Sequence, residues 1–153
     1  MFANILKRMK VVELGDADLR QPISVTDRGE LATVGNLIAE KAPPGVRDLF
    51  GSTASYVGAH IKPVNKLPPT DLRRVAVEVL ERADPTRRVA AIGSGPYSSR
   101  QLIREVEEQS AMGTRIVDAI RLNGVFVETA ITSGKIRPKD SPYSSLRAPD
   151  FDI

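Results

Sequence analysis

The residues best suited to chemistry form a glycine-rich loop that leads into a helix start, at Gly93, Ser94, Gly95, Ser98 and Arg100. Backbone N–H groups at a helix N-terminus carry partial positive charge, and glycine lets a ligand approach the backbone closely. The Arg100 guanidinium would add positive charge beside them. The order of these residues is therefore typical of a candidate anion-binding loop.

This loop departs from the two best-known phosphate-binding patterns. A P-loop needs GxxxxGK[ST], and no lysine follows these glycines. A dinucleotide-binding fingerprint needs a third glycine where this chain has Ser98, and Pro96 removes one N–H donor. Ser98 and Gln101 instead match a capping box. We therefore favour a helix-capping connector, with anion binding as the alternative.

The chain lacks most of the side chains used for nucleophilic and metal chemistry. It contains no cysteine and a single histidine, His60. Thiol nucleophiles and cysteine-ligated metal sites are thereby excluded. Glu105, Glu107 and Glu108 gather carboxylates on one predicted helix, but Arg104 lies beside them and indicates a solvated helix face. We therefore predict no catalytic residue, no metal ligand and no cofactor, in a protein that is not an enzyme.

Two apolar segments, one early and one late in the sequence, favour protein binding. The first places apolar residues at i, i+3, i+4 and i+7 of a predicted helix. The second alternates apolar and acidic residues, as an added β-strand would. In the alternative interpretation each segment packs on its own domain. The candidate docking residues are Phe2, Ile5, Leu6, Met9, Phe151 and Ile153.

The elements that must position these residues are mainly helices. A capping box at Asp27 and Glu30 predicts a helix that ends at the Pro-containing stretch 42–45. Apolar residues recur at helical spacing over 70–83 and again over 98–133, where Gly113 is expected to break or bend the helix.

Three other stretches have strand-like character, namely 9–26, 54–64 and 88–92. The sequence thus predicts a mainly α fold with four to five helices and a small β element. A full α+β domain is the alternative.

Length and patterning predict one domain followed by a tail. The 153 residues suffice for a single domain with a buried core. Helical periodicity ends at Gly134, so we place a globular domain at 1–134 and a tail rich in Pro and Ser at 135–153. No apolar run approaches the roughly 18 residues of a membrane-spanning helix, and residues 1–10 do not resemble a signal peptide. We expect a cytoplasmic protein.

The charge is basic but dispersed. Lys and Arg total 22 against 19 Asp and Glu, for a net charge of +3. The basic doublets at 7–8, 73–74 and 87–88 do not belong to any longer run of basic residues. We therefore predict an adaptor or accessory subunit that binds another protein chain or forms a homo-oligomer. A nucleic-acid-binding protein that uses these doublets is the alternative.

The docking hypothesis predicts that residues 146–153 are needed for assembly. Native mass spectrometry of complexes isolated from the protein's own cells would compare the full chain with a chain cut after Ser145. We expect a stoichiometric protein partner that is lost on truncation. A monomer without a partner in both forms would contradict the adaptor hypothesis.

Overall fold

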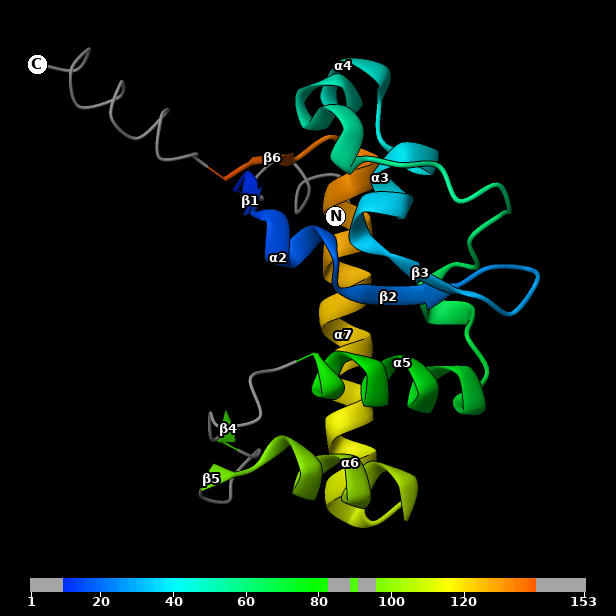
Figure 1. Ribbon diagram of the computed structural model, residues 1–153, viewed down its shortest axis with the longest axis vertical. Helices are drawn as coiled ribbons and strands as arrows, with labels where there is room; N and C mark the ends of the chain where they lie inside the picture. Colours follow the sequence, from blue (N-terminus) through cyan, green and yellow to red (C-terminus); the bar gives the residue numbers. More distant parts are fainter. Residues whose placement is uncertain (1–9, 83–88, 91–95, 140–153) are drawn as a thin grey trace, which may run out of the picture.

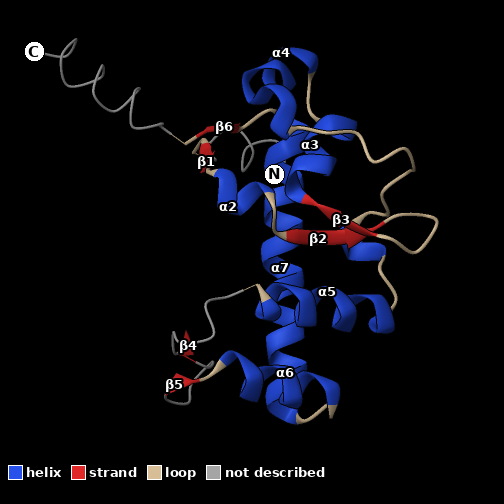
Figure 2. Cartoon of the chain, viewed as in Figure 1, coloured by secondary structure: helices blue, strands red, loops and turns tan. Residues whose placement is uncertain are grey.

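The computed structural model describes residues 10–82, 89–90 and 96–139. Within these ranges the protein is mainly helical with a small β part, as the sequence predicts (Figure 2). None of the helices there is long and apolar enough to cross a membrane. The α-helices of the described ranges are α2 (Asp16–Leu19), α3 (Val34–Lys41), α4 (Pro44–Arg47), α5 (Pro69–Glu81), α6 (Ser99–Glu107) and α7 (Ala111–Ser133), joined by the short 3-10 helices η1 (Asp48–Thr53) and η2 (Val64–Lys66).

The strands form three small two-stranded pairings in the described part of the chain. Val12 lies opposite Ile136 in the parallel pair, so paired structure continues past the predicted domain boundary at residue 134. The pairs are β1 (Val12–Leu14) with β6 (Ile136–Pro138) in parallel, β2 (Pro22–Val25) with β3 (Leu31–Thr33) antiparallel, and β4 (Val89–Ala90) with β5 (Pro96–Tyr97) antiparallel.

Helix α7 forms the long axis of the molecule (Figure 1). Its 23 residues give it a length of about 34 Å. Near its C-terminus, Ala130 and Ile131 pack into a hydrophobic cluster with residues of α3, β1, β2 and β6. Near its N-terminus, Ile116 packs into a second cluster with α5 and α6. The two clusters are therefore held together by one helix.

Local signals at three helix ends are confirmed. The Ser98 Oγ accepts a hydrogen bond from the Gln101 amide at 3.2 Å, which starts α6. Helix α3 ends at Lys41, immediately before the 42–45 stretch. Gly134 closes α7 with a left-handed φ of 77°, a conformation that glycine adopts without steric cost.

The predicted helix start at Asp27 is wrong. Residues 31–33 form strand β3, which pairs with β2, and α3 begins only after them. The capping box is made by Thr33 and Asn36, whose side chains each bond the other residue's backbone N–H. The β2–β3 hairpin pairs backbone groups that a longer helix would have used, so this pairing overrides the capping signal at Asp27.

The break between α6 and α7 lies earlier than predicted. It falls at residues 108–110, where Gln109 adopts a positive φ of 55°. Ser110 caps α7, because its Oγ accepts from the Gly113 amide at 3.0 Å. Gly113 itself lies inside α7, where a Cβ would approach the Glu105 carbonyl oxygen to 2.0 Å. Its role is thus to let the two helix backbones touch.

We predict that Gly113→Ala destabilises the protein by about 2–3 kcal/mol, because the new methyl group has no room against the α6 backbone. Urea unfolding followed by circular dichroism would measure the loss. Gly45→Ala is the matched control, since a Cβ there meets nothing within 4 Å. Equal stability of the two variants would contradict a close helix contact at Gly113.

Candidate functional site

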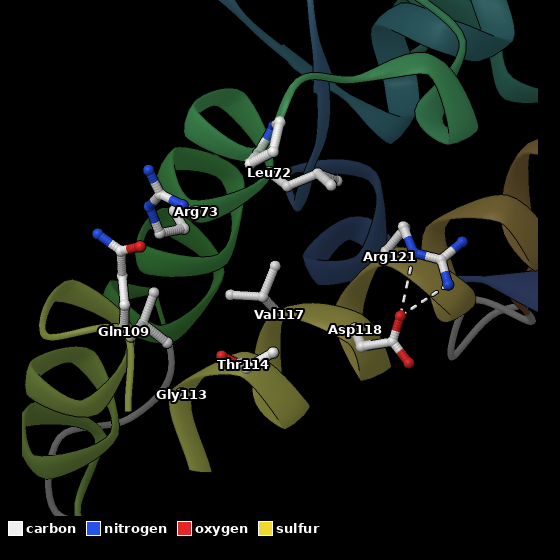
Figure 3. A pocket seen from close by; sticks show the side chains of 10 residues that line it. Leu72, Arg73, Gln109, Gly113, Thr114, Val117, Asp118 and Arg121 are labelled. Carbon is white, nitrogen blue, oxygen red and sulfur yellow. Dashed lines mark hydrogen bonds and ion pairs between the residues drawn. The ribbon is translucent and has the colours of Figure 1, made fainter. Parts of the chain in front are cut away.

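A groove of about 200 Å³ lies between the N-terminal parts of α5 and α7 (Figure 3). We call it the α5–α7 groove. Its lining combines the start of α5, the end of α6, the α6–α7 turn and the first turns of α7. The lining residues are Pro69, Leu72, Arg73, Val106, Gln109, Gly113, Thr114, Val117, Asp118 and Arg121.

The centre of the groove is apolar. Leu72 and Val117 are half-buried, and Val106 is fully buried beneath the groove. Gly113, Val117 and Arg121 follow one another at i, i+4 spacing, so a single face of α7 supplies this side of the lining. The helix contact at Gly113 fixes how α6 meets α7 and thereby the shape of this end of the groove.

The rim of the groove is charged, and its two sides differ. On the α7 side, Arg121 donates from Nε and Nη2 to the Asp118 Oδ1 at 3.2 and 2.7 Å. On the other side lie Arg73 and Gln109, with Val117 between the two sides (Figure 3). Within the described ranges the Arg73 side chain makes neither a hydrogen bond nor an ion pair. Its guanidinium is therefore the rim charge that is available to a ligand.

Two large apolar side chains are exposed further along α7. Leu122 is 55% exposed and Phe126 is 47% exposed. Leu122 and Phe126 are four residues apart and share one face of α7. With 3.6 residues per turn, that face is turned by about 140–180° from Val117, so it lies on the side of α7 away from the groove. We call Leu122 and Phe126 the α7 stripe. The groove and the stripe thus use two different faces of the same helix, with the Asp118–Arg121 ion pair between them.

The polar side chains of the lining include the Asp118–Arg121 ion pair and Thr114, which precedes Asp118 by four residues. No set of three or more His, Cys, Asp or Glu side chains in the described part of the chain could hold a metal ion. The volume is below the 300–1,000 Å³ of common small-molecule sites, which suits one inserted apolar side chain.

The single histidine has a structural contact. His60 Nδ1 lies 3.1 Å from the Glu40 Oε1, and the second oxygen of Glu40 accepts from the Ile61 amide at 3.0 Å. Both contacts tie the 54–64 segment to α3. Ile61 also bridges to Thr26 in an antiparallel pairing, which is the strand character that the sequence indicated there.

Most of the predicted site residues lie outside the described ranges. These are the docking residues Phe2, Ile5, Leu6, Met9, Phe151 and Ile153, together with Gly93, Ser94 and Gly95 of the candidate anion loop. Of that loop the structure describes Ser98 and Arg100. The Ser98 amide donates to the Gln101 Oε1 at 2.8 Å, so it is engaged in the cap, and Arg100 is exposed. Anion binding by the loop stays a prediction.

The sequence pattern alone does not reveal the α5–α7 groove or the α7 stripe. Leu72 and Val117 fit the buried periodic pattern of their helices, and nothing in the pattern marks them as accessible. Leu122 and Phe126 did carry a signal, because they are large apolar residues that fall off the periodic face formed by Ile120 and Val127. A search for such off-face residues would have found the stripe.

Comparison of the chain with known proteins gives no further assignment. No protein-family model matches it, and neither the curated proteins nor the solved structures include a significant match.

Two carboxylates share the C-terminal end of α5. A side-chain hydrogen bond with Glu78 and the negative charge of that residue raise the pKa of Glu81 above its ordinary value. Glu107 adds repulsion, whereas Arg82, which lies 3.5 Å from Glu78, opposes the rise. The folded protein thus holds a proton on Glu81 more tightly than the unfolded chain does.

We predict that Glu81→Gln stabilises the protein at pH 7. A raised carboxyl pKa contributes stability that is lost as the pH rises from about 4.3 through the folded-state pKa, and the amide removes that loss. Thermal unfolding would be measured between pH 3 and 7. The melting temperatures of the variant and the natural chain should differ at pH 7 and become equal at the acidic end. Glu108→Gln, in an exposed residue that does not act on Glu81, is the control. If the variant were more stable than the natural chain by the same amount at pH 3, the raised pKa of Glu81 would not be the cause.

Proposed function

We propose that this chain is a non-enzymatic protein-interaction module, an adaptor or accessory subunit, whose α5–α7 groove and α7 stripe bind a segment of another protein. The observation that carries the proposal is the exposure of large apolar side chains on α7, the helix that also forms one wall of the groove. An apolar groove of about 200 Å³ and two exposed large side chains, Leu122 and Phe126, share one helix in the described structure.

The energetics favour a protein as the bound species. Full burial of an exposed Leu or Phe side chain stabilises a complex by about 1.5–3 kcal/mol. Protein interfaces commonly centre on such an anchor and surround it with polar groups that exclude water. Leu72 and Val117 supply the pocket for a partner's anchor, while Leu122 and Phe126 extend the contact beyond it.

The rim specifies the chemistry of the partner. Arg73 lacks a partner within the described ranges, and a carboxylate is the group that a guanidinium binds best. We therefore propose an amphipathic helix as the partner segment. It would insert one apolar side chain into the groove and carry an Asp or Glu near Arg73, while another part of the partner covers the α7 stripe.

The nucleic-acid alternative has weaker support. Of the basic doublets, Arg73–Arg74 lies in the described part of the chain, and the Arg74 guanidinium donates to the Gly29 carbonyl oxygen. The neighbouring helix α6 exposes Glu107 and Glu108, which would repel phosphates. A steep decrease of DNA affinity with salt would be its signature.

We predict that Leu122→Glu and Phe126→Glu each weaken partner binding at least tenfold, because a carboxylate in an apolar interface must be desolvated. Full-length protein would be used to isolate the partner. A peptide spanning its contacting segment would then be titrated by calorimetry. Arg73→Glu should weaken the same complex by repelling the partner's carboxylate.

Leu49→Glu is the matched control, since Leu49 is 59% exposed on η1 and lies outside this surface. It should leave the affinity unchanged. Equal binding by all four variants would refute the proposed surface. If the natural chain forms a symmetric dimer and the α7 variants dissociate it, the partner at this surface is a second copy of the chain and not another protein.

A further inference from the structure

A polar cavity of about 510 Å³ lies where α2, the start of α3, the end of η1 and the end of α5 meet. We call it the α2–α5 cavity. It shares no lining residue with the α5–α7 groove, and its volume falls within the roughly 300–1,000 Å³ of common small-molecule sites. The buried Leu19 is the one apolar residue of its lining, so the cavity suits a polar ligand.

Charged side chains of both signs line this cavity, namely Asp16, Arg20 and Arg82. The side chains of Asp16 and Arg20 make no hydrogen bond or ion pair within the described residues, although they stand at the spacing of a helical ion pair. Arg82 contacts Glu78 at 3.5 Å, which is longer than the roughly 2.7–2.9 Å of a charge-assisted hydrogen bond. The Arg20 guanidinium is therefore available to an anion, and Arg82 can join it by giving up a weak contact.

Hydroxyl groups supply further donors to the same cavity. The hydroxyl oxygens of Thr33 and Ser55 each accept a hydrogen bond from Asn36, at 3.2 and 3.4 Å. Neither hydroxyl donates a hydrogen bond in the described part of the chain, and the Ser52 side chain makes none there. Three O–H donors are thus left for a ligand, beside the N–H groups of the two arginines.

The balance of these groups specifies the chemistry of the ligand. Donors outnumber acceptors, so the ligand must be rich in acceptor oxygens. A phosphate monoester carries close to two negative charges at neutral pH and three acceptor oxygens, which matches two guanidinium groups. The carboxylate of Asp16 only accepts and would repel a bare anion, so the ligand must also bring a hydroxyl donor.

We propose that the α2–α5 cavity binds the phosphate monoester of a small polyol or sugar. The phosphate binds Arg20 and Arg82, and a hydroxyl of the polyol donates to Asp16. The hydroxyls of Thr33 and Ser52 donate to the remaining ligand oxygens.

The test compares three probes that separate the phosphate from the polyol. The full chain would be titrated at constant ionic strength with glycerol 3-phosphate, inorganic phosphate and glycerol, and NMR shifts of the Arg20 and Ser52 amides would give the affinities. We expect glycerol 3-phosphate to bind about tenfold more tightly than inorganic phosphate, the ratio that one additional hydrogen bond gives. Glycerol alone should cause no shift. Equal affinities for the two phosphates, or no shift with glycerol 3-phosphate, would overturn the proposal.

Two variants of α2 assign the roles of its charged side chains. Arg20→Gln removes the guanidinium and should weaken glycerol 3-phosphate binding at least tenfold. Asp16→Ala should tighten the binding of inorganic phosphate and reduce the preference for glycerol 3-phosphate to less than twofold, because repulsion and the hydroxyl contact are lost together.

Arg115→Gln is the matched control, since Arg115 is exposed on α7, lies outside the cavity and carries the same charge. It should leave both affinities unchanged. An equal loss in Arg20→Gln and Arg115→Gln would indicate unspecific attraction of anions and would overturn the site. These measurements do not involve the α5–α7 groove or the α7 stripe, so this proposal and the proposed function can fail separately.

Discussion

The structure depends on the burial of one long helix in two separate hydrophobic clusters. Helix α7 contributes Ile116 to the cluster with α5 and α6, and Ala130 and Ile131 to the cluster with α3 and the β1–β6 pair. Helices draw most of their stability in proteins from such packing and little from intrinsic propensity. Anything that shifts α7 along its axis would therefore disturb both clusters at once.

The contact at Gly113 sets the position of α6 on this axis. A helix pair normally keeps its axes apart by side-chain packing, whereas here the Glu105 carbonyl comes within reach of the α7 backbone. The short link of residues 108–110 and the Ser110 cap hold that arrangement. The groove beside it is shaped by backbone geometry as much as by the side chains that line it.

Sequence patterns predicted those parts of the fold that local chemistry determines. The capping box of Ser98 and Gln101 and the closing Gly134 each concern residues a few positions apart, and both are present. Pairings between distant residues were not predictable in this way. The partner of β6 lies 124 positions away in the sequence, so no local pattern identifies it. The pattern at Asp27 predicts a helix start, whereas this residue lies in the turn of the β2–β3 hairpin, in which Gly29 has a φ of 81°.

The candidate sites likewise depend on contacts between residues that are distant in the sequence. The groove brings Leu72 and Val117 together from helices far apart in sequence, and each of them alone looks like an ordinary core residue. The docking residues, by contrast, were predicted from single segments of the sequence, and that prediction needed no knowledge of the surrounding structure.

The parallel pairing of β1 with β6 has a consequence for biosynthesis. Glu13 and Arg137 face each other across this pair although they lie 124 positions apart. The cluster that contains Leu14 also contains Ile136, so it is incomplete until that late segment has left the ribosome. The buried residues of the α5–α6–α7 cluster all lie between 76 and 116 and are available earlier. During translation the helical cluster can thus assemble first, and the loop-closing strand pair must come last.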